Sequence, residues 1–185
     1  MGKSTAAICV LFLAQHVLFA DETPVPSSWR DSWTSSLGAT WNSENHTVAL
    51  PLRMYHVRST YDDSYIDRFN EAPWGIGVER FFVDAKRNRH SFYAMAFKDS
   101  YSHVEPIVGY AWEKNFHLDN AGDMRIGLGY SAAITARHKQ HYIPFPGAVP
   151  SLSLNYKSVS LQTTWVPYVG HNSGNVFMTV FKIGI

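Results

Sequence analysis

The stretch "MRIGLGYSAAITAR", residues 124–137, carries the clearest hydrophobic pattern in the chain. Every second residue is apolar: Met124, Ile126, Leu128, Tyr130, Ala132, Ile134 and Ala136. The residues between them are small or polar, with an arginine at each end. A period of two sustained over 14 residues predicts a β-strand that is longer than most strands of soluble sheets. One apolar face opposite one small, polar face is typical of a transmembrane barrel, whose apolar side meets lipid.

Similar patterns occur in seven other segments of the chain. We expect strands at 48–58, 71–82, 90–98, 105–117, 124–136, 150–156, 159–167 and 175–185. In the third strand we expect Tyr93, Met95 and Phe97 to face lipid, and Ala94 and Ala96 to face inward. The sequence therefore predicts an all-β fold, an eight-stranded antiparallel transmembrane β-barrel. A soluble lipocalin-like barrel is the alternative, but such a barrel does not need an apolar outer face.

The expected connections alternate in length, with long ones at 59–70 and 137–149. Bacterial outer-membrane barrels have short turns at the periplasmic end and longer loops outside. An even number of strands places both termini at the periplasmic end. The connections at 59–70 and 99–104 then lie on the same outer rim.

Residues 1–20 have the pattern of a secretory signal peptide. Lys3 precedes an apolar run that ends at Ala14, and the small residue Ala20 precedes Asp21. Removal of Lys3 lowers Lys+Arg from 16 to 15, which equals Asp+Glu at 15. A neutral chain does not provide the basic face that nucleic acid requires, so we expect no nucleic-acid partner. The only cysteine, Cys9, also lies in this segment, so the exported chain is expected to lack disulfides.

Residues 21–47 are expected to form an N-terminal segment that precedes the barrel at 48–185. Within this segment Trp29, Trp33, Leu37 and Trp41 recur at every fourth residue. This spacing predicts an amphipathic α-helix with one apolar stripe. Tryptophan is enriched at membrane–water interfaces, so we expect the helix to lie in the interface. Packing of the helix on a soluble core is the alternative.

Small residues and prolines suggest a channel for a ligand. Small inward-facing residues either leave a narrow apolar tube or only allow the strands to coil, and composition does not decide between the two. Proline cannot donate a ladder hydrogen bond and is normally confined to strand edges, which a closed barrel lacks. We therefore expect two lateral openings in the wall, one at Pro51 and Pro73 and the other at Pro150 and Pro167. The alternative is that these prolines only end strands.

The candidate catalytic residues are His56, Asp99 and Ser100, which the strand order places on the outer rim. Histidine exchanges a proton near neutral pH, a carboxylate can orient it, and a serine hydroxyl can attack an ester or bind it. The spacing alone is also compatible with an ordinary Asp-Ser turn. No Gly-x-Ser-x-Gly motif is present, and no metal or cofactor is expected.

Several irregular words of the sequence resemble the outer-membrane lipid A palmitoyltransferase family, PagP. They are "RFNEAPWG" (68–75), "YAMAFKDSY" (93–101), "EPIVGYAWE" (105–113), "ITAR" (134–137), "YIPFP" (142–146) and "SGNVF" (173–177). The resemblance runs in order from about Trp29 to the C-terminus. It implies transfer of a palmitoyl chain from a glycerophospholipid donor to lipid A of lipopolysaccharide, in a monomer that contacts membrane lipids. It also implies an outer-membrane location with an outward-facing active site.

By position, the resemblance implies that His56, Asp99 and Ser100 are catalytic and that Ala111 is the floor of the acyl pocket. A reference member of the family has glycine at the Ala111 position, so a donor chain slightly shorter than palmitate is expected. An outer-membrane phospholipase, with water as acceptor, is an alternative function. A non-enzymatic adhesin or structural barrel is another.

Overall fold

The computed structural model describes residues 27–185, with side chains from Trp33 onward. The expected signal peptide at 1–20 lies outside these residues. Eight strands pair antiparallel in sequence order, and β8 closes onto β1, so the predicted eight-stranded barrel is confirmed. The strands are β1 (His46–His56), β2 (Gly75–Val83), β3 (Asn88–Lys98), β4 (Val104–His117), β5 (Met124–Thr135), β6 (Phe145–Tyr156), β7 (Val159–Val166) and β8 (Val176–Gly184).

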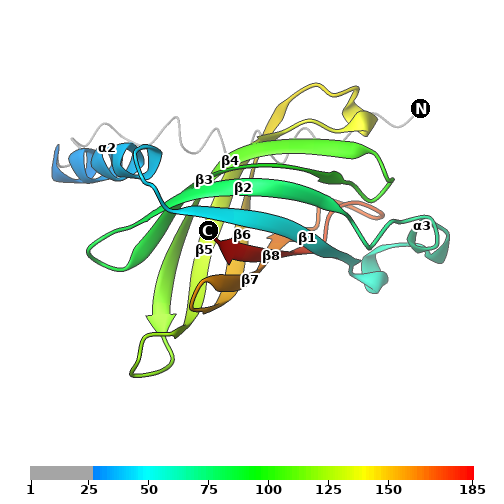
Figure 1. Cartoon of the computed structure of the whole chain (residues 1–185). Helices are drawn as coiled ribbons and strands as arrows, with labels where there is room; N and C mark the ends of the chain where they lie inside the picture. Colours follow the sequence, from blue (N-terminus) through cyan, green and yellow to red (C-terminus); the bar gives the residue numbers. More distant parts are fainter. Residues whose placement is uncertain (1–26) are drawn as a thin grey trace.

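The four connections at one end of the barrel carry most of the irregular structure (Figure 1). The β1–β2 connection contains the short helices η1 (Arg58–Thr60) and α3 (Asp63–Ile66), and the β5–β6 connection contains η2 (His138–Gln140). The helix α2 (Ser27–Trp41) lies at the opposite end, together with the chain's C-terminus (Figure 1). The strand order thus brings His56, Asp99 and Ser100 to one rim, as the sequence predicted. No helix within residues 27–185 is long and apolar enough to cross a membrane.

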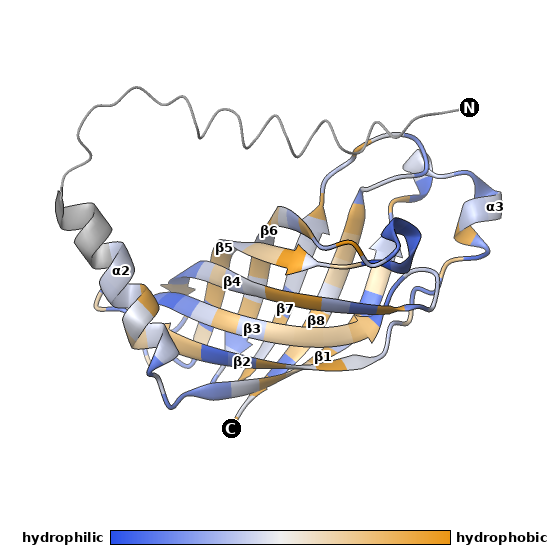
Figure 2. Ribbon diagram, turned by 90° about the horizontal axis from the view of Figure 1, so that it is seen from above, coloured by the Kyte–Doolittle hydropathy of each residue, from blue (hydrophilic) through white to orange (hydrophobic). Residues whose placement is uncertain are grey.

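Apolar residues predominate along the middle of the strands, and hydrophilic residues concentrate in the connections (Figure 2). Large apolar side chains are exposed on the wall, among them Ile76, Val108 and Leu152. On β5 the predicted faces are confirmed, because Leu128 and Ile134 are exposed while Ser131 and Thr135 are buried. Long strands with an apolar outer face bury their polar residues inside, the reverse of a soluble domain.

The assignment of faces on β3 was wrong. Ala94 and Ala96 are exposed, whereas Phe97 is buried with only 5% of its surface accessible. Tyr93 also turns inward, since its hydroxyl bonds to Ser131 Oγ at 2.6 Å. Alternation shows which residues share a face, but both faces of this strand are apolar. Residue size alone therefore did not identify the lipid side.

Two strands, β2 and β6, begin four and five residues away from the expected positions. β2 begins at Gly75 rather than at residue 71, so Pro73 precedes the strand. β6 begins at Phe145 rather than at residue 150 and includes Pro146, which pairs with Ile134 of β5. Proline is tolerated there because residues 145–150 have no ladder partner on the β7 side.

The helix α2 packs on the outside of the barrel against β2 and β3. Its Trp33 ring lies 5.6 Å from the Tyr110 ring, and its Trp41 ring lies 6.1 Å from the Phe92 ring. Trp33 and Trp41 nevertheless stay exposed, and Leu37 is half-buried. The predicted helix is present, and Trp33 and Trp41 of its expected stripe meet outward-facing aromatic residues of the wall; the Trp29 side chain lies outside the described part.

Candidate active site

His56 is the last residue of β1 and points into the barrel, where only 2% of it is accessible. Its Nε2 atom lies 2.9 Å from Ser100 Oγ. Ser100 follows β3 by two residues, so the histidine and the serine come from different strands and meet at the rim. A nucleophile within hydrogen-bond distance of a base is the arrangement that activates serine.

The carboxylate that contacts His56 belongs to Glu71, not to Asp99. Glu71 Oε1 accepts a hydrogen bond from the His56 main-chain N–H and lies 3.1 Å from His56 Nδ1. Arg58 donates two hydrogen bonds to Glu71, at 2.6 and 2.7 Å. These bonds from Arg58 are the main cause that lowers the pKa of Glu71 to about 2. The carboxylate beside His56 is therefore ionised at any physiological pH.

The Asp99 carboxylate contacts main-chain groups of the β3–β4 turn. It is buried, and its Oδ1 accepts hydrogen bonds from the main-chain N–H groups of Tyr101 and His103 at 2.9 and 2.8 Å. The Asp99 side chain therefore shapes the β3–β4 turn that carries Ser100. In this structure Glu71 and not Asp99 contacts the imidazole, and a catalytic role of Asp99 stays a prediction.

Aromatic rings enclose the imidazole on its remaining sides. The Phe69 ring stacks on His56 at 4.2 Å, and the Tyr61 ring meets it edge-on at 5.3 Å. Tyr61 is buried, and its hydroxyl donates a hydrogen bond to the Gly174 carbonyl of the β7–β8 connection. Burial raises the pKa of Tyr61 to about 12, so this hydroxyl stays protonated. The site is thus closed by three of the four connections at this end.

The wall lacks ladder pairing at two places near the prolines. β1 pairs with β2 only from His46 to Ala49, so the segment that begins at Pro51 has no ladder partner there. β6 pairs with β7 only from Ser151 onward, which leaves Pro150 beyond the last pair, and Pro167 directly follows β7. Both unpaired stretches lie at the same end of the barrel as Ser100.

Ala111 faces the interior and is buried, with 7% of it accessible. In the sheet it pairs with Ser91 on one side and Ser131 on the other. The Tyr93 hydroxyl lies close to this level, because it bonds to the Oγ of Ser131, the residue that pairs with Ala111. Between this level and the rim the buried residues include the apolar Met54 and Phe97, and also Glu105, which accepts a 2.7 Å hydrogen bond from Thr135.

The interior becomes charged directly beyond Ala111. The next inward residue of β4, Glu113, is buried and accepts a 2.6 Å hydrogen bond from Ser153. The buried carboxylate of Glu79 pairs with Arg89 at 2.7 Å and also with Lys182. An acyl chain gains free energy only from apolar surroundings, so this charged layer would end the apolar section.

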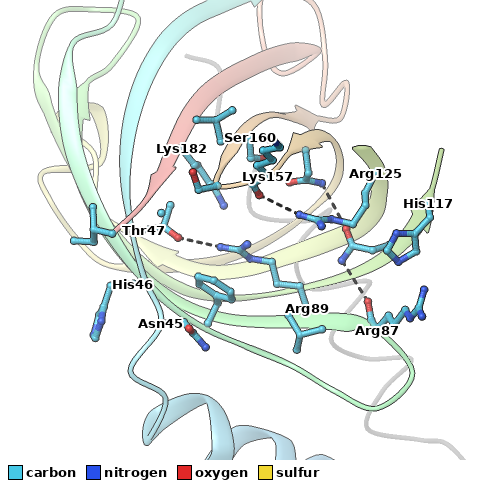
Figure 3. Close-up of a pocket in the computed structure, with 18 residues that line it drawn as sticks. Asn45, His46, Thr47, Arg87, Arg89, His117, Arg125, Lys157, Ser160 and Lys182 are labelled. Atoms are coloured by element: carbon cyan, nitrogen blue, oxygen red, sulfur yellow. Dashed lines mark hydrogen bonds between the residues drawn. The ribbon is translucent and has the colours of Figure 1, made fainter. Parts of the chain in front are cut away.

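A cavity of about 500 Å³ opens at the α2 end, beyond the charged layer (Figure 3). Its lining includes five lysines and arginines and no acidic residue. Arg125 donates to the main-chain carbonyls of Gly122 and Lys157, and Arg89 and Lys182 share Glu79. A cationic, open cavity of this kind is unsuitable for an acyl chain, and it lies far from His56.

Comparison with known proteins reveals a family match across the barrel. The family described as "Antimicrobial peptide resistance and lipid A acylation protein PagP" matches residues 36–182. The chain belongs to the PagP family. A protein named "Lipid A acyltransferase PagP" from Laribacter hongkongensis is 43% identical over 151 residues, which cover 82% of this chain and 71% of that protein.

Two further relatives with the same name extend this result. The PagP of Yersinia enterocolitica is 44% identical over 78% of this chain and 70% of its own length. The PagP of Salmonella typhi is 39% identical over 92% of this chain and 90% of its own length. The range that matches the PagP family includes His56, Glu71, Asp99, Ser100 and Ala111. Membership of the PagP family confirms the resemblance inferred from the irregular words of the sequence.

Two residues of the site were missed in the sequence. Glu71 belongs to "RFNEAPWG", but a glutamate in a long connection has no periodic pattern that would direct it to His56. Tyr93 was assigned to the wrong face. Its inward direction could have been found from Ser91, because a serine two residues away favours the polar interior of a membrane barrel.

Proposed function

We propose that this protein transfers a long acyl chain from a glycerophospholipid to lipid A in the outer membrane. The observation that carries the proposal is the contact between Ser100 Oγ and His56 Nε2 at 2.9 Å, on the barrel rim beside the buried apolar side chains of Met54 and Phe97. Membership of the PagP family, together with relatives named lipid A acyltransferase, supports the choice of acceptor. We further propose that this rim faces outward.

In the proposed reaction Ser100 is the nucleophile and His56 is the base. The Ser100 oxygen attacks the donor ester carbonyl while His56 Nε2 takes the hydroxyl proton. The ester bond then breaks, and the proton passes from His56 to the departing lysophospholipid oxygen. A lipid A hydroxyl next attacks the acyl-serine, again giving its proton to His56, and Ser100 regains that proton as the new ester leaves. Asp99 holds the turn that presents Ser100.

The unpaired stretches of the wall are the proposed entrances for lipid. Proline has no main-chain N–H, so the wall lacks hydrogen-bond donors at Pro51, Pro73, Pro150 and Pro167. A lipid chain would therefore enter there without breaking hydrogen bonds between strands. The acyl chain would then lie in the barrel interior with its end near Ala111. No residue of this scheme requires a metal or cofactor.

A reconstituted assay tests the proposal. The purified protein is mixed with a phospholipid that carries a labelled acyl chain and with lipid A, and the products are separated by mass. We expect acylated lipid A and lysophospholipid in equal amounts. Free fatty acid without acylated lipid A would favour a phospholipase, and no product at all would favour a non-enzymatic barrel. A Ser100→Ala protein is the matched control and should give neither product.

A further inference from the structure

Glu71 is the one acidic residue within residues 27–185 that contacts His56, and it also contacts the β1 residue Met54. Its side chain meets His56 at the main-chain N–H and at Nδ1, both at 3.1 Å. We infer that Glu71 is the positioning residue for His56, and that it keeps Nδ1 protonated so that Nε2 is free to accept the Ser100 proton. This inference rests on the proposed acyl transfer.

The assignment of the proton follows from the chemistry of the two groups. An ionised carboxylate can only accept hydrogen bonds, so the Nδ1 atom that faces it must donate. A neutral imidazole carries one proton, and with Nδ1 protonated the Nε2 atom has a free lone pair. That lone pair lies 2.9 Å from Ser100 Oγ. Without Glu71 nothing near Nδ1 would select this tautomer.

Glu71 is itself held in place and kept ionised. Arg58 binds it through two parallel hydrogen bonds, and Arg58 Nη1 also donates to the His56 carbonyl at 3.1 Å. Arg53 lies 3.7 Å from the outer oxygen of the same carboxylate. These two cations are the charged groups that face Glu71 from β1 and η1. A bidentate pair fixes both the position and the orientation of the carboxylate plane.

The same residue also bridges the outer end of the unpaired stretch between β1 and β2. The Glu71 carbonyl accepts a 3.0 Å hydrogen bond from the Met54 main-chain N–H. Glu71 therefore anchors the connection to β1 through its main chain and its side chain at once. The attachment of Glu71 to β1, which closes this side of the barrel at the rim, therefore also fixes the orientation of the His56 ring.

Asp99 does not provide an alternative carboxylate. Its Oδ1 accepts two main-chain hydrogen bonds within its own turn, at 2.9 and 2.8 Å. The aromatic neighbours Phe69 and Tyr61 contact the imidazole through ring faces and edges, which select no tautomer. Glu71 is thus the group in this part of the structure with the right charge and distance.

The first test observes the tautomer directly, without activity. The full protein is prepared with ¹⁵N-labelled histidine in detergent micelles, and the two imidazole nitrogens of His56 are assigned by NMR. We expect a protonated Nδ1 and an unprotonated Nε2 in the wild type, and a mixture of tautomers in Glu71→Gln. A wild-type His56 with its proton on Nε2 would overturn the inference whatever the enzyme does.

The second test is kinetic and compares three variants. We expect Glu71→Gln to lower kcat by roughly 10²- to 10⁴-fold with little change in KM. Loss of the negative charge also makes the imidazolium less stable, so the acidic limb of the kcat profile should move to lower pH. Glu71→Asp should recover part of the rate, and Asp67→Asn, an exposed carboxylate in the same connection, should match the wild type.

The outcomes separate this inference from the proposed function. A wild type that transfers acyl chains, with Glu71→Gln equal to it in kcat and pH profile, would reject the role of Glu71 alone. A wild type without acyl transfer would reject the proposed function, and the NMR experiment would still decide the tautomer. Circular dichroism of each variant checks that the barrel is folded. If Glu71→Gln fails to fold, Glu71→Asp serves as the kinetic variant.

Discussion

Removal of the Ala111 methyl group should lengthen the preferred acyl chain. Ala111 lies seven residues from Val104, which pairs with Lys98 just before Asp99 and Ser100. At ~3.3 Å per residue along a strand that is tilted by ~40°, this separation corresponds to a depth of ~18 Å. An extended long acyl chain that starts at Ser100 would therefore end near Ala111, directly above the charged layer.

The size of the effect follows from one methyl group. An Ala111→Gly substitution gives the chain end the space of about one more carbon, and burial of one methylene contributes ~0.8 kcal/mol. This free energy corresponds to an ~4-fold change in relative rate between two donors that differ by one methylene. The optimum of Ala111→Gly is therefore expected to lie about one carbon above that of the wild type.

The assay is a competition among phospholipid donors whose acyl chains differ by single methylenes. Each protein is given the same donor mixture, and the mass distribution of the acylated lipid A is recorded. Ala94→Gly is the matched control, because it makes the same chemical change on the lipid-facing side of β3. An identical optimum in wild type and Ala111→Gly would show that Ala111 is not the floor. A shift in Ala94→Gly would refute the assignment of faces.

Three further experiments test separate parts of the structure. Val149 and Val166 continue the β6–β7 register beyond its last pair, and cysteines at these two positions should form a disulfide that blocks acyl transfer until reductant is added. Full activity with the disulfide formed would show that lipid does not enter between β6 and β7. A Trp33→Ala substitution should lower the free energy of unfolding by about 1 kcal/mol through loss of the Tyr110 contact and leave transfer unchanged, as urea unfolding in detergent and the transfer assay would measure. Glu71, with a pKa of about 2 when folded and ~4.3 when unfolded, contributes stability that is present above pH ~4.3 and is lost as the pH falls toward 2. The melting temperature of Glu71→Gln should thus be lower than that of the wild type at pH 6 and should approach it at pH 2; a constant difference would contradict this reasoning.

Much of the barrel could be predicted because hydrophobic alternation and connection length depend only on residues that are close together in the sequence. Period-two alternation in 124–137 identifies a strand and its two faces, and the parity of connections then places His56 and Ser100 on one rim. On β3 the same rule failed, because Tyr93 and Phe97 are as apolar as a lipid-facing residue should be. Both faces of β3 carry apolar residues near the rim, so polarity does not separate these faces there.

The partner of His56 could not be predicted for a different reason. Glu71 reaches the histidine from a connection whose path depends on η1, α3 and the bond to Met54. None of these features is associated with a repeat or a characteristic residue spacing that could be recognised in the sequence. Asp99 is close to Ser100 in sequence and was therefore the obvious carboxylate, but the tight turn that follows β3 uses its oxygen for main-chain hydrogen bonds.

The mass of lipid A from cells that contain this protein tests the central claim most directly. Lipid A is extracted from a Gram-negative host without such an enzyme, once with the wild type and once with His56→Ala. We expect lipid A heavier by one long acyl chain with the wild type, and no change with His56→Ala although the barrel is present in the membrane. Unchanged lipid A with the wild type, or equal acylation with both proteins, would contradict acyl transfer by the Ser100–His56 pair.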